Sequence, residues 1–161
     1  MRTVWPRPST RGKSRSPSSP EHLAAWRAFL EAHAAVLRPL ERELEAECGL
    51  PLPWYDVLVQ LNEAPDKRLR MQSLARAVLL SKSRITRLVD SMEAAGLIRR
   101  QPCPKDKRGM EVLLTVAGYE RLRAASPVHL RGIAEHFSQH LTAEEAATLR
   151  RALARVAAAA E

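Results

Sequence analysis

The spacing of apolar and polar residues between positions 70 and 118 predicts two helices followed by a β-hairpin. Ile85, Leu88, Val89 and Met92 stand at i, i+3, i+4 and i+7, so we expect them to form one buried stripe on the second helix. Gly96 is expected to end that helix, because glycine adopts the left-handed C′ conformation at little cost. The two predicted helices and the hairpin read RMQSLARAVLL, SKSRITRLVDSMEAAG and LIRRQPCPKDKRGMEVLLT.

The second helix also has a polar face on the side away from that stripe. At about 100° per residue, Ser83, Arg87 and Asp90 point away from the apolar side chains, with Arg84 and Ser91 at the flanks. A bidentate arginine reads guanine in the major groove, and serine or threonine hydroxyls bond to bases or phosphates. The pattern therefore predicts a helix-turn-helix that reads DNA.

Helical periodicity continues on both sides of this segment. A helix is predicted over residues 21–47, with a kink or an interruption near Leu37 or Arg38, because Pro39 lacks an N–H donor. Thr115 is expected to cap a helix over 116–140 that Pro127 interrupts, and Thr142 with Glu145 forms a capping box for a last helix. A helix over 54–63 and a very short strand over 68–70 complete the expected elements.

Apolar residues form a seam along the first predicted helix, with a leucine every seven residues from Leu23 to Leu44 and Trp26 and Leu40 at the complementary spacing. Two arrangements remain open, because the seam packs either on the last helix of its own chain or on a second copy. An exposed seam is a liability for a monomer, and a two-fold dimer places two recognition helices about 34 Å apart.

The formal net charge of +8 is unevenly distributed along the 161 residues. Residues 1–20 carry a net charge of +5, residues 66–108 carry +8, and the rest of the chain carries −5. Positive charge therefore gathers on the helix-turn-helix, the hairpin and the N-terminal arm, which favours a polyanionic partner.

Length and composition favour one domain with a tail. Residues 1–20 are rich in proline and serine and have little to bury, which predicts a disordered basic arm. No secretory signal or membrane-spanning run is visible, and the two cysteines give no disulfide framework. We therefore expect a cytoplasmic protein with no membrane partner.

Four segments of the chain resemble the MarR family of winged helix-turn-helix transcriptional regulators: YDVLVQLNEAP, RMQSLARAV, SRITRLVDSMEAAGLIRR and DKRGMEVLLTVAG. The resemblance covers residues 21–157. It implies a mainly α fold with a small β wing, in which residues 21–64 and 116–161 form the dimerisation helices of a homodimer. Residues 66–115 would then form the winged DNA-binding lobe.

The resemblance also implies which residues meet DNA. Asp106 is expected to orient Arg108, which would enter the minor groove from the wing, whereas the second helix reads the major groove. The expected DNA-binding residues are Ser81, Lys82, Ser83, Arg84, Thr86, Arg87, Lys105, Asp106, Lys107 and Arg108.

Five residues lie on segments that form an effector pocket in that family: Trp26, His33, Trp54, Tyr55 and Asp56. For each of them, a role in the core or at a helix start is the more ordinary interpretation. Redox sensing through Cys48 or Cys103 is disfavoured, because acidic residues precede the first and two prolines flank the second.

His136 and His140 have a metal-ligand spacing, but a structural zinc site needs four ligands, and the nearest carboxylate, Glu135, lies on a different helix face from His140. We therefore predict no metal and no cofactor.

The leading hypothesis is a sequence-specific transcriptional regulator, a repressor released from a pseudo-palindromic operator in double-stranded DNA by a small organic ligand. The alternative is an architectural or accessory nucleic-acid protein that uses the same winged module without an effector. An enzyme is not expected, because the chain has no glycine-rich phosphate loop, no G-x-S-x-G turn and no catalytic metal cluster. No catalytic residue is predicted.

Overall fold

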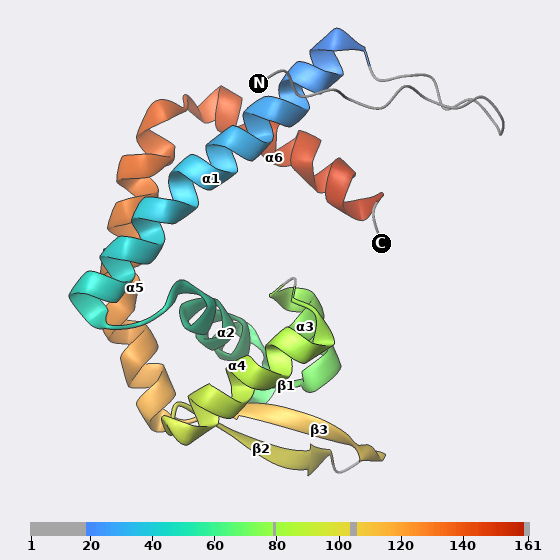
Figure 1. The fold of residues 1–161 in the computed structure, drawn as a ribbon, viewed down its shortest axis with the longest axis vertical. Helices are drawn as coiled ribbons and strands as arrows, with labels where there is room; N and C mark the ends of the chain where they lie inside the picture. The colour runs from blue at the N-terminus through green and yellow to red at the C-terminus, as the bar shows by residue number, and fades with distance from the viewer. Residues whose placement is uncertain (1–18, 79, 104–105, 160–161) are drawn as a thin grey trace, which may run out of the picture. The chain divides into compact units, whose positions relative to one another are not determined.

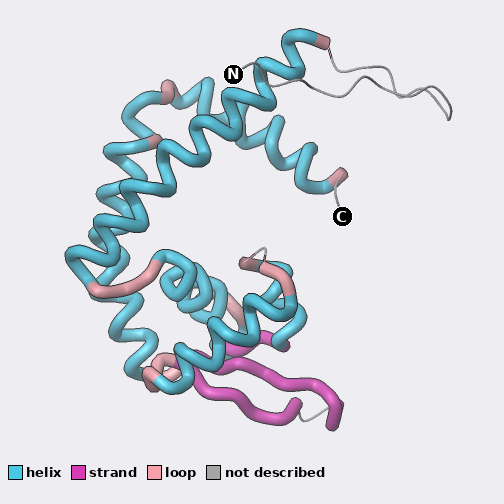
Figure 2. The backbone as a smooth tube through the Cα atoms, viewed as in Figure 1, coloured by secondary structure: helices cyan, strands magenta, loops and turns pink. Residues whose placement is uncertain are grey.

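The structure is a computed structural model that describes residues 19–78, 80–103 and 106–159. The chain comprises two units, residues 1–34 and residues 35–161. As the sequence predicted, the fold is mainly helical with one small antiparallel sheet (Figures 1 and 2). The described elements are α1 Pro20–Cys48, α2 Leu52–Glu63, β1 Arg68–Arg70, α3 Met71–Ala77, α4 Lys82–Ala94, β2 Ile98–Cys103, β3 Asp106–Leu114, α5 Val116–His136 and α6 Ala143–Ala158, with short 3-10 turns at Pro65–Lys67 and Ser138–His140.

Helix α1 continues through Pro39 as one helix, so it is not interrupted there as the sequence had suggested. The carbonyl left without a donor belongs to Ala35, which is exposed and open to water. Just beyond the proline, Leu40 and Leu44 are buried and anchor the last turns of the helix. Gly49, with a φ of +57°, then ends the helix.

Helix α5 likewise passes through Pro127 without a break, because the carbonyl four residues earlier belongs to the exposed Arg123. The helix ends at His136, earlier than the predicted limit near residue 140, and a 3-10 turn follows. Near its start, Arg121 donates from Nη2 to the carbonyl of Gly49 at 3.0 Å and also to that of Cys48. These bonds satisfy carbonyl groups at the end of α1 and tie it to α5.

The core lies where α2, α3 and α4 meet the sheet. Ile85, Val89 and Met92 are fully buried and Leu88 is half-buried, which confirms the predicted apolar stripe of α4. Fully burying each such side chain contributes about 1.5–3 kcal/mol. Gly96 follows the helix with a φ of +75°, so its predicted role as the C′ residue is confirmed. This packing fixes which face of α4 remains outside.

The sheet has the strand order β1-β3-β2 and is antiparallel throughout. Ile98 pairs with Leu114 and Arg68 with Leu113, which places the predicted short strand beside the hairpin. The ladder becomes irregular between Pro102 and Cys103, on an edge strand where a proline is tolerated. Figures 1 and 2 show β2 and β3 as a long hairpin along one side of the helices.

Two predicted caps position the helices that follow the hairpin. The Thr115 hydroxyl accepts from the Gly118 N–H at 3.0 Å and lies 2.9 Å from the Leu97 carbonyl, to which it donates. A Cβ at Gly118 would lie 2.0 Å from that carbonyl oxygen, so α5 approaches the residue before β2 this closely only because residue 118 is glycine. The capping box of Thr142 and Glu145 at α6 is also confirmed.

Within the described part of the chain, no residue of helix α6 is buried. In the described ranges, no helix has both the length and the apolarity needed to cross a membrane.

Candidate nucleic-acid interface

Helix α4 presents a polar face at its N-terminal end. Ser81 is the N-cap: its Oγ accepts from the Arg84 N–H at 3.4 Å and lies 3.3 Å from the Ser83 Oγ. Ser83, Arg84 and Arg87 are all exposed, since the packing of Ile85 and its neighbours turns the opposite face inward. An N-terminal turn that offers hydroxyls, arginines and free N–H groups is suited to anionic phosphates.

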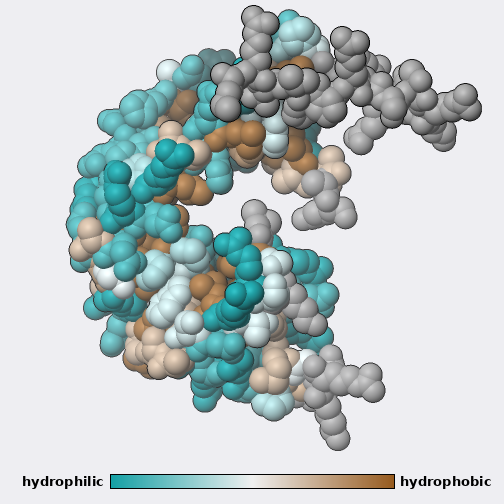
Figure 3. Space-filling view, in the orientation of Figure 1, coloured by the Kyte–Doolittle hydropathy of each residue, from teal (hydrophilic) through white to brown (hydrophobic). Residues whose placement is uncertain are grey.

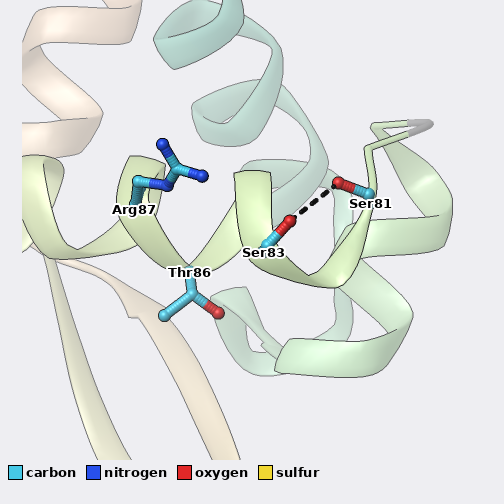
Figure 4. A pocket seen from close by; sticks show the side chains of 4 residues that line it. All are labelled: Ser81, Ser83, Thr86 and Arg87. Atoms are coloured by element: carbon cyan, nitrogen blue, oxygen red, sulfur yellow. Dashed lines mark hydrogen bonds between the residues drawn. The ribbon is translucent and has the colours of Figure 1, made fainter.

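A hollow of about 710 Å³ lies along this face, lined by Ser81, Ser83, Thr86 and Arg87 (Figure 4). The close-up shows the two serines bonded to each other, with Thr86 and Arg87 on different sides of the helix. Figure 3 shows hydrophilic side chains gathered over α4. The structure thus brings together five of the predicted DNA-binding residues, Ser81, Ser83, Arg84, Thr86 and Arg87.

The remaining predicted DNA-binding residues are less completely described. Lys82 lies in the first turn of α4, and Asp106, Lys107 and Arg108 begin β3 beside the hairpin loop. The side chains of these four residues, and all of Lys105, lie outside the described part of the chain.

Arg100 joins the wing to α4, a role that sequence reasoning missed. From β2, its guanidinium bonds to Asp90 at 2.5 Å and to Glu93 at 2.5–2.7 Å, and its backbone N–H donates to Glu93 Oε1 at 2.6 Å. The Arg100 hydrogen bonds hold the pKa of Glu93 below its usual value, and Glu93 in turn raises the pKa of Arg100. We call these three residues the α4–wing clamp.

The described basic side chains near α4 and the sheet therefore fall into two groups, those that form ion pairs and those that do not. Arg100 is held in the clamp, and Arg68 bonds to Asp66 at 2.8 Å and lies 4.0 Å from Glu111. Arg84 and Arg87, by contrast, make no ion pair with any residue in the described ranges. Their charge is therefore exposed on the open face of α4.

Comparison with known proteins agrees with this geometry. Residues 49–109 match the model of the MarR family. The chain is 35% identical over 113 residues to the uncharacterized HTH-type transcriptional regulator YkoM of Bacillus subtilis, covering 70% of this chain and 71% of that protein. This chain belongs to the MarR family. It is thus a DNA-binding transcriptional regulator of the winged helix-turn-helix type.

Two further relatives of this MarR-family protein are informative. Sco3205, a MarR family transcriptional regulator from Streptomyces coelicolor whose structure is a complex with DNA, superposes with a TM-score of 0.83. Its sequence identity is 35%, and the match covers 89% of this chain and 94% of that one. The HTH-type transcriptional repressor YetL of B. subtilis is 33% identical over 85 residues, or 53% of this chain and 51% of YetL.

A second cavity of this MarR-family protein, of about 420 Å³, lies between α2 and α5. Sequence reasoning missed it, because its lining comes from two helices that are more than 50 residues apart in the chain. It is lined by Asn62, Tyr119, Leu122, Arg123, Ser126, Pro127 and Leu130.

Of the five predicted effector residues, Tyr55 lies next to this cavity. Its hydroxyl donates to the Oγ of the lining residue Ser126 at 3.4 Å. Trp54 packs half-buried against the core, and Asp56 is exposed at its surface although partial desolvation raises its pKa. Trp26 and His33 are exposed on the first half of α1, where Phe29 lies between them, with ring centroids 5.9 and 6.2 Å away.

Proposed function

We propose that this MarR-family regulator is a homodimeric repressor that binds a pseudo-palindromic operator and leaves it when a small organic ligand binds. The observation that carries the proposal is the open face of α4, where Arg84 and Arg87 are exposed above a fully buried apolar stripe. The DNA complex of the similar Sco3205 and the repressor activity named for YetL support it. The proposed domain limits are those expected from the sequence, with residues 66–115 as the DNA-binding lobe.

In this proposal, Ser83, Arg84 and Arg87 contact bases and phosphates in the major groove, and Arg108 enters the minor groove from the wing. Ser81, Lys82, Thr86, Lys105 and Lys107 contact the phosphate backbone, and Asp106 orients the wing. Such contacts make binding strongly salt-dependent, with a loss of about 10³–10⁵ in affinity between roughly 50 and 200 mM salt if six to ten phosphates are neutralised.

Dimerisation is supported by apolar side chains that the single chain leaves open. On α6, Val156 is 67% exposed and Leu153 is 37% exposed. On the first half of α1, Leu23 and Trp26 are 57% and 58% exposed, although Leu40 and Leu44 at the other end of the same seam are buried. A second copy is the partner that a two-fold operator requires.

The cavity between α2 and α5 supports ligand control. Its volume of about 420 Å³ falls in the range of about 300–1,000 Å³ that small-molecule pockets occupy. Its lining combines apolar Leu122 and Leu130 with the Tyr119 hydroxyl and the Arg123 guanidinium. This combination suits an aromatic or aliphatic molecule that carries an anionic group. Tyr55 lies beside this cavity, and Trp26, His33, Trp54 and Asp56 remain the other effector candidates expected from the sequence.

The first experiment measures binding to the DNA upstream of the chain's own gene against a shuffled duplex at about 150 mM salt. We expect one dimer per site and a preference of three or more powers of ten for the genuine sequence. If the upstream DNA and the shuffled duplex bind equally, genome-wide footprinting is the next step. Fragments recovered in that way that also bind no more tightly than shuffled DNA would favour an effector-independent architectural protein.

A second experiment screens small aromatic carboxylates for release of the bound operator. The active compound is then tested on Arg123→Ala, with Arg38→Ala on the exposed side of α1 as the matched loss of charge. Weaker release only in Arg123→Ala supports the cavity, and equal release by all three proteins would place the effector elsewhere.

A further inference from the structure

Two helices bring three potential metal ligands together at the end of α5, away from the DNA-binding lobe. Glu135 and His136 stand in the last turn of α5, and Glu43 faces them from α1. One ligand atom from each residue lies within 4.8 Å of the other two. The closest pair is the Glu43 Oε1 and the His136 Nε2, which are 2.6 Å apart.

The second oxygen of Glu43 is an independent sign that this cluster is incomplete. Its Oε2 is shielded from solvent and has no hydrogen-bond partner among the described residues, although the Glu43 side chain as a whole is 26% exposed. A buried carboxylate oxygen without a partner is unfavourable, because the lost hydration is not replaced. A cation between the three side chains would supply the missing partner.

Gly132 and Arg131 lie beside the cluster. Gly132, one turn before His136, is needed because a Cβ there would lie 2.8 Å from Glu43 Oε2 and 2.6 Å from the Leu40 side chain. The nearby Arg131 guanidinium is bonded to Glu47, one turn further along α1. Arg131 thus donates to Glu47 rather than to Glu43, although its positive charge also acts on Glu43 and Glu135. At the cluster, α1 and α5 approach each other closely.

We propose that Glu43, Glu135 and His136 form a divalent-cation site of zinc type. Zinc accepts imidazole nitrogen together with carboxylate oxygens, and three protein ligands leave a fourth tetrahedral position for water. The imidazole disfavours magnesium and calcium, which prefer oxygen ligands.

The ion would take the place of the hydrogen bond between Glu43 and His136. Ligands about 2.0–2.2 Å from zinc are roughly 3.4 Å from one another in a tetrahedral site. The 2.6 Å separation of Glu43 Oε1 and His136 Nε2 must therefore open slightly, and any separation near the 4.8 Å limit must close. Glu135 is exposed, so rotation of its side chain is sufficient to bring its carboxylate closer to the other two ligands.

The sequence pattern indicated a different pair of possible ligands and led to the prediction that no metal is bound. His136 and His140 have the right spacing on a single helix, but α5 ends at His136 and His140 lies in the following 3-10 turn. The ligand that changes the interpretation is Glu43, which is 93 residues away from His136 in the chain. The site would join the end of α1 to the end of α5.

The test is calorimetric titration of the chelator-treated full chain with Zn²⁺. We expect one ion per chain and a rise in the thermal midpoint of about 5–10 °C when Zn²⁺ is present at roughly one hundred times its dissociation constant. Glu43→Gln and His136→Gln should each weaken binding by at least about tenfold. Glu45→Gln, the same change on an exposed position of α1, is the matched control.

Circular dichroism checks that each variant retains its helix content, and the two variants test the same site independently. Unchanged Zn²⁺ affinity in a folded Glu43→Gln or His136→Gln protein would overturn the proposal. X-ray absorption of the zinc-loaded wild type should show only nitrogen and oxygen ligands, and a sulfur ligand would assign the ion to a cysteine instead. None of these measurements depends on DNA binding.

Discussion

At the scale of single residues, Arg87 has the strongest claim to a direct role in reading DNA. It is exposed on α4, lines the hollow beside Ser83 and forms no ion pair with the described residues. We predict that Arg87→Ala weakens operator binding by about 1–3 kcal/mol, because a bidentate contact to guanine is lost. Fluorescence anisotropy with labelled operator measures this, and Arg38→Ala should bind as the wild type does. Equal weakening by both variants would mean that the loss of one positive charge, and not a specific contact of Arg87, causes the effect.

His129 predicts a pH dependence of stability. Its ring is tilted against that of Tyr55 with the centroids 4.4 Å apart, its Nδ1 is buried with no hydrogen-bond partner among the described residues, and burial lowers its pKa. Below the ordinary value of 6.5, the unfolded chain therefore binds a proton before the folded one does. The free energy of unfolding should fall between about pH 7.5 and pH 5.5. Urea unfolding of His129→Phe should show a smaller fall, and an identical slope would exclude this histidine as the cause.

At the scale of elements, the α4–wing clamp joins β2 of the hairpin to α4. Because its ion pairs are partly exposed, Arg100→Ala should change overall stability by only about 1 kcal/mol or less. Operator affinity should fall further than that, since wing and helix must reach adjacent grooves together. Amide exchange at residue 100 should also accelerate, as its N–H loses a fixed acceptor. Arg99→Ala, on an exposed neighbouring position, is the control, and equal losses of affinity in both would argue against the clamp.

At the scale of the whole molecule, the proposed homodimer depends on the exposed apolar face of α6. Val156→Glu places a charge on that face, whereas Ala154→Glu places it about 160° away on the same helix. We predict that Val156→Glu shifts the protein toward monomer and lowers operator affinity at a given concentration, whereas Ala154→Glu does neither. Sedimentation velocity across a dilution series measures the shift. A wild-type protein that stays monomeric at high concentration would contradict the proposal directly.

Local patterns were enough to predict most of the elements. The apolar stripe of α4, the positive φ of Gly96, and the caps at Thr115 and Thr142 depend on residues within a few positions of one another. The predicted effects of the two prolines on their helices were less accurate. Whether Pro39 or Pro127 ends a helix depends on whether the unpaired carbonyl reaches water and on which side chains anchor the next turn.

The sequence by itself determined that a basic helix with one apolar and one polar face would lie in a winged lobe, because that information is carried by periodicity and charge over short distances. Only the tertiary structure decided which basic side chains remain unpaired among the described residues, since Arg100 and Arg68 form ion pairs with acids from other elements. It also brought Glu43 to His136 and placed Arg123 on a cavity beside α2. Contacts between residues so far apart follow from the packing of whole helices, which no local pattern specifies.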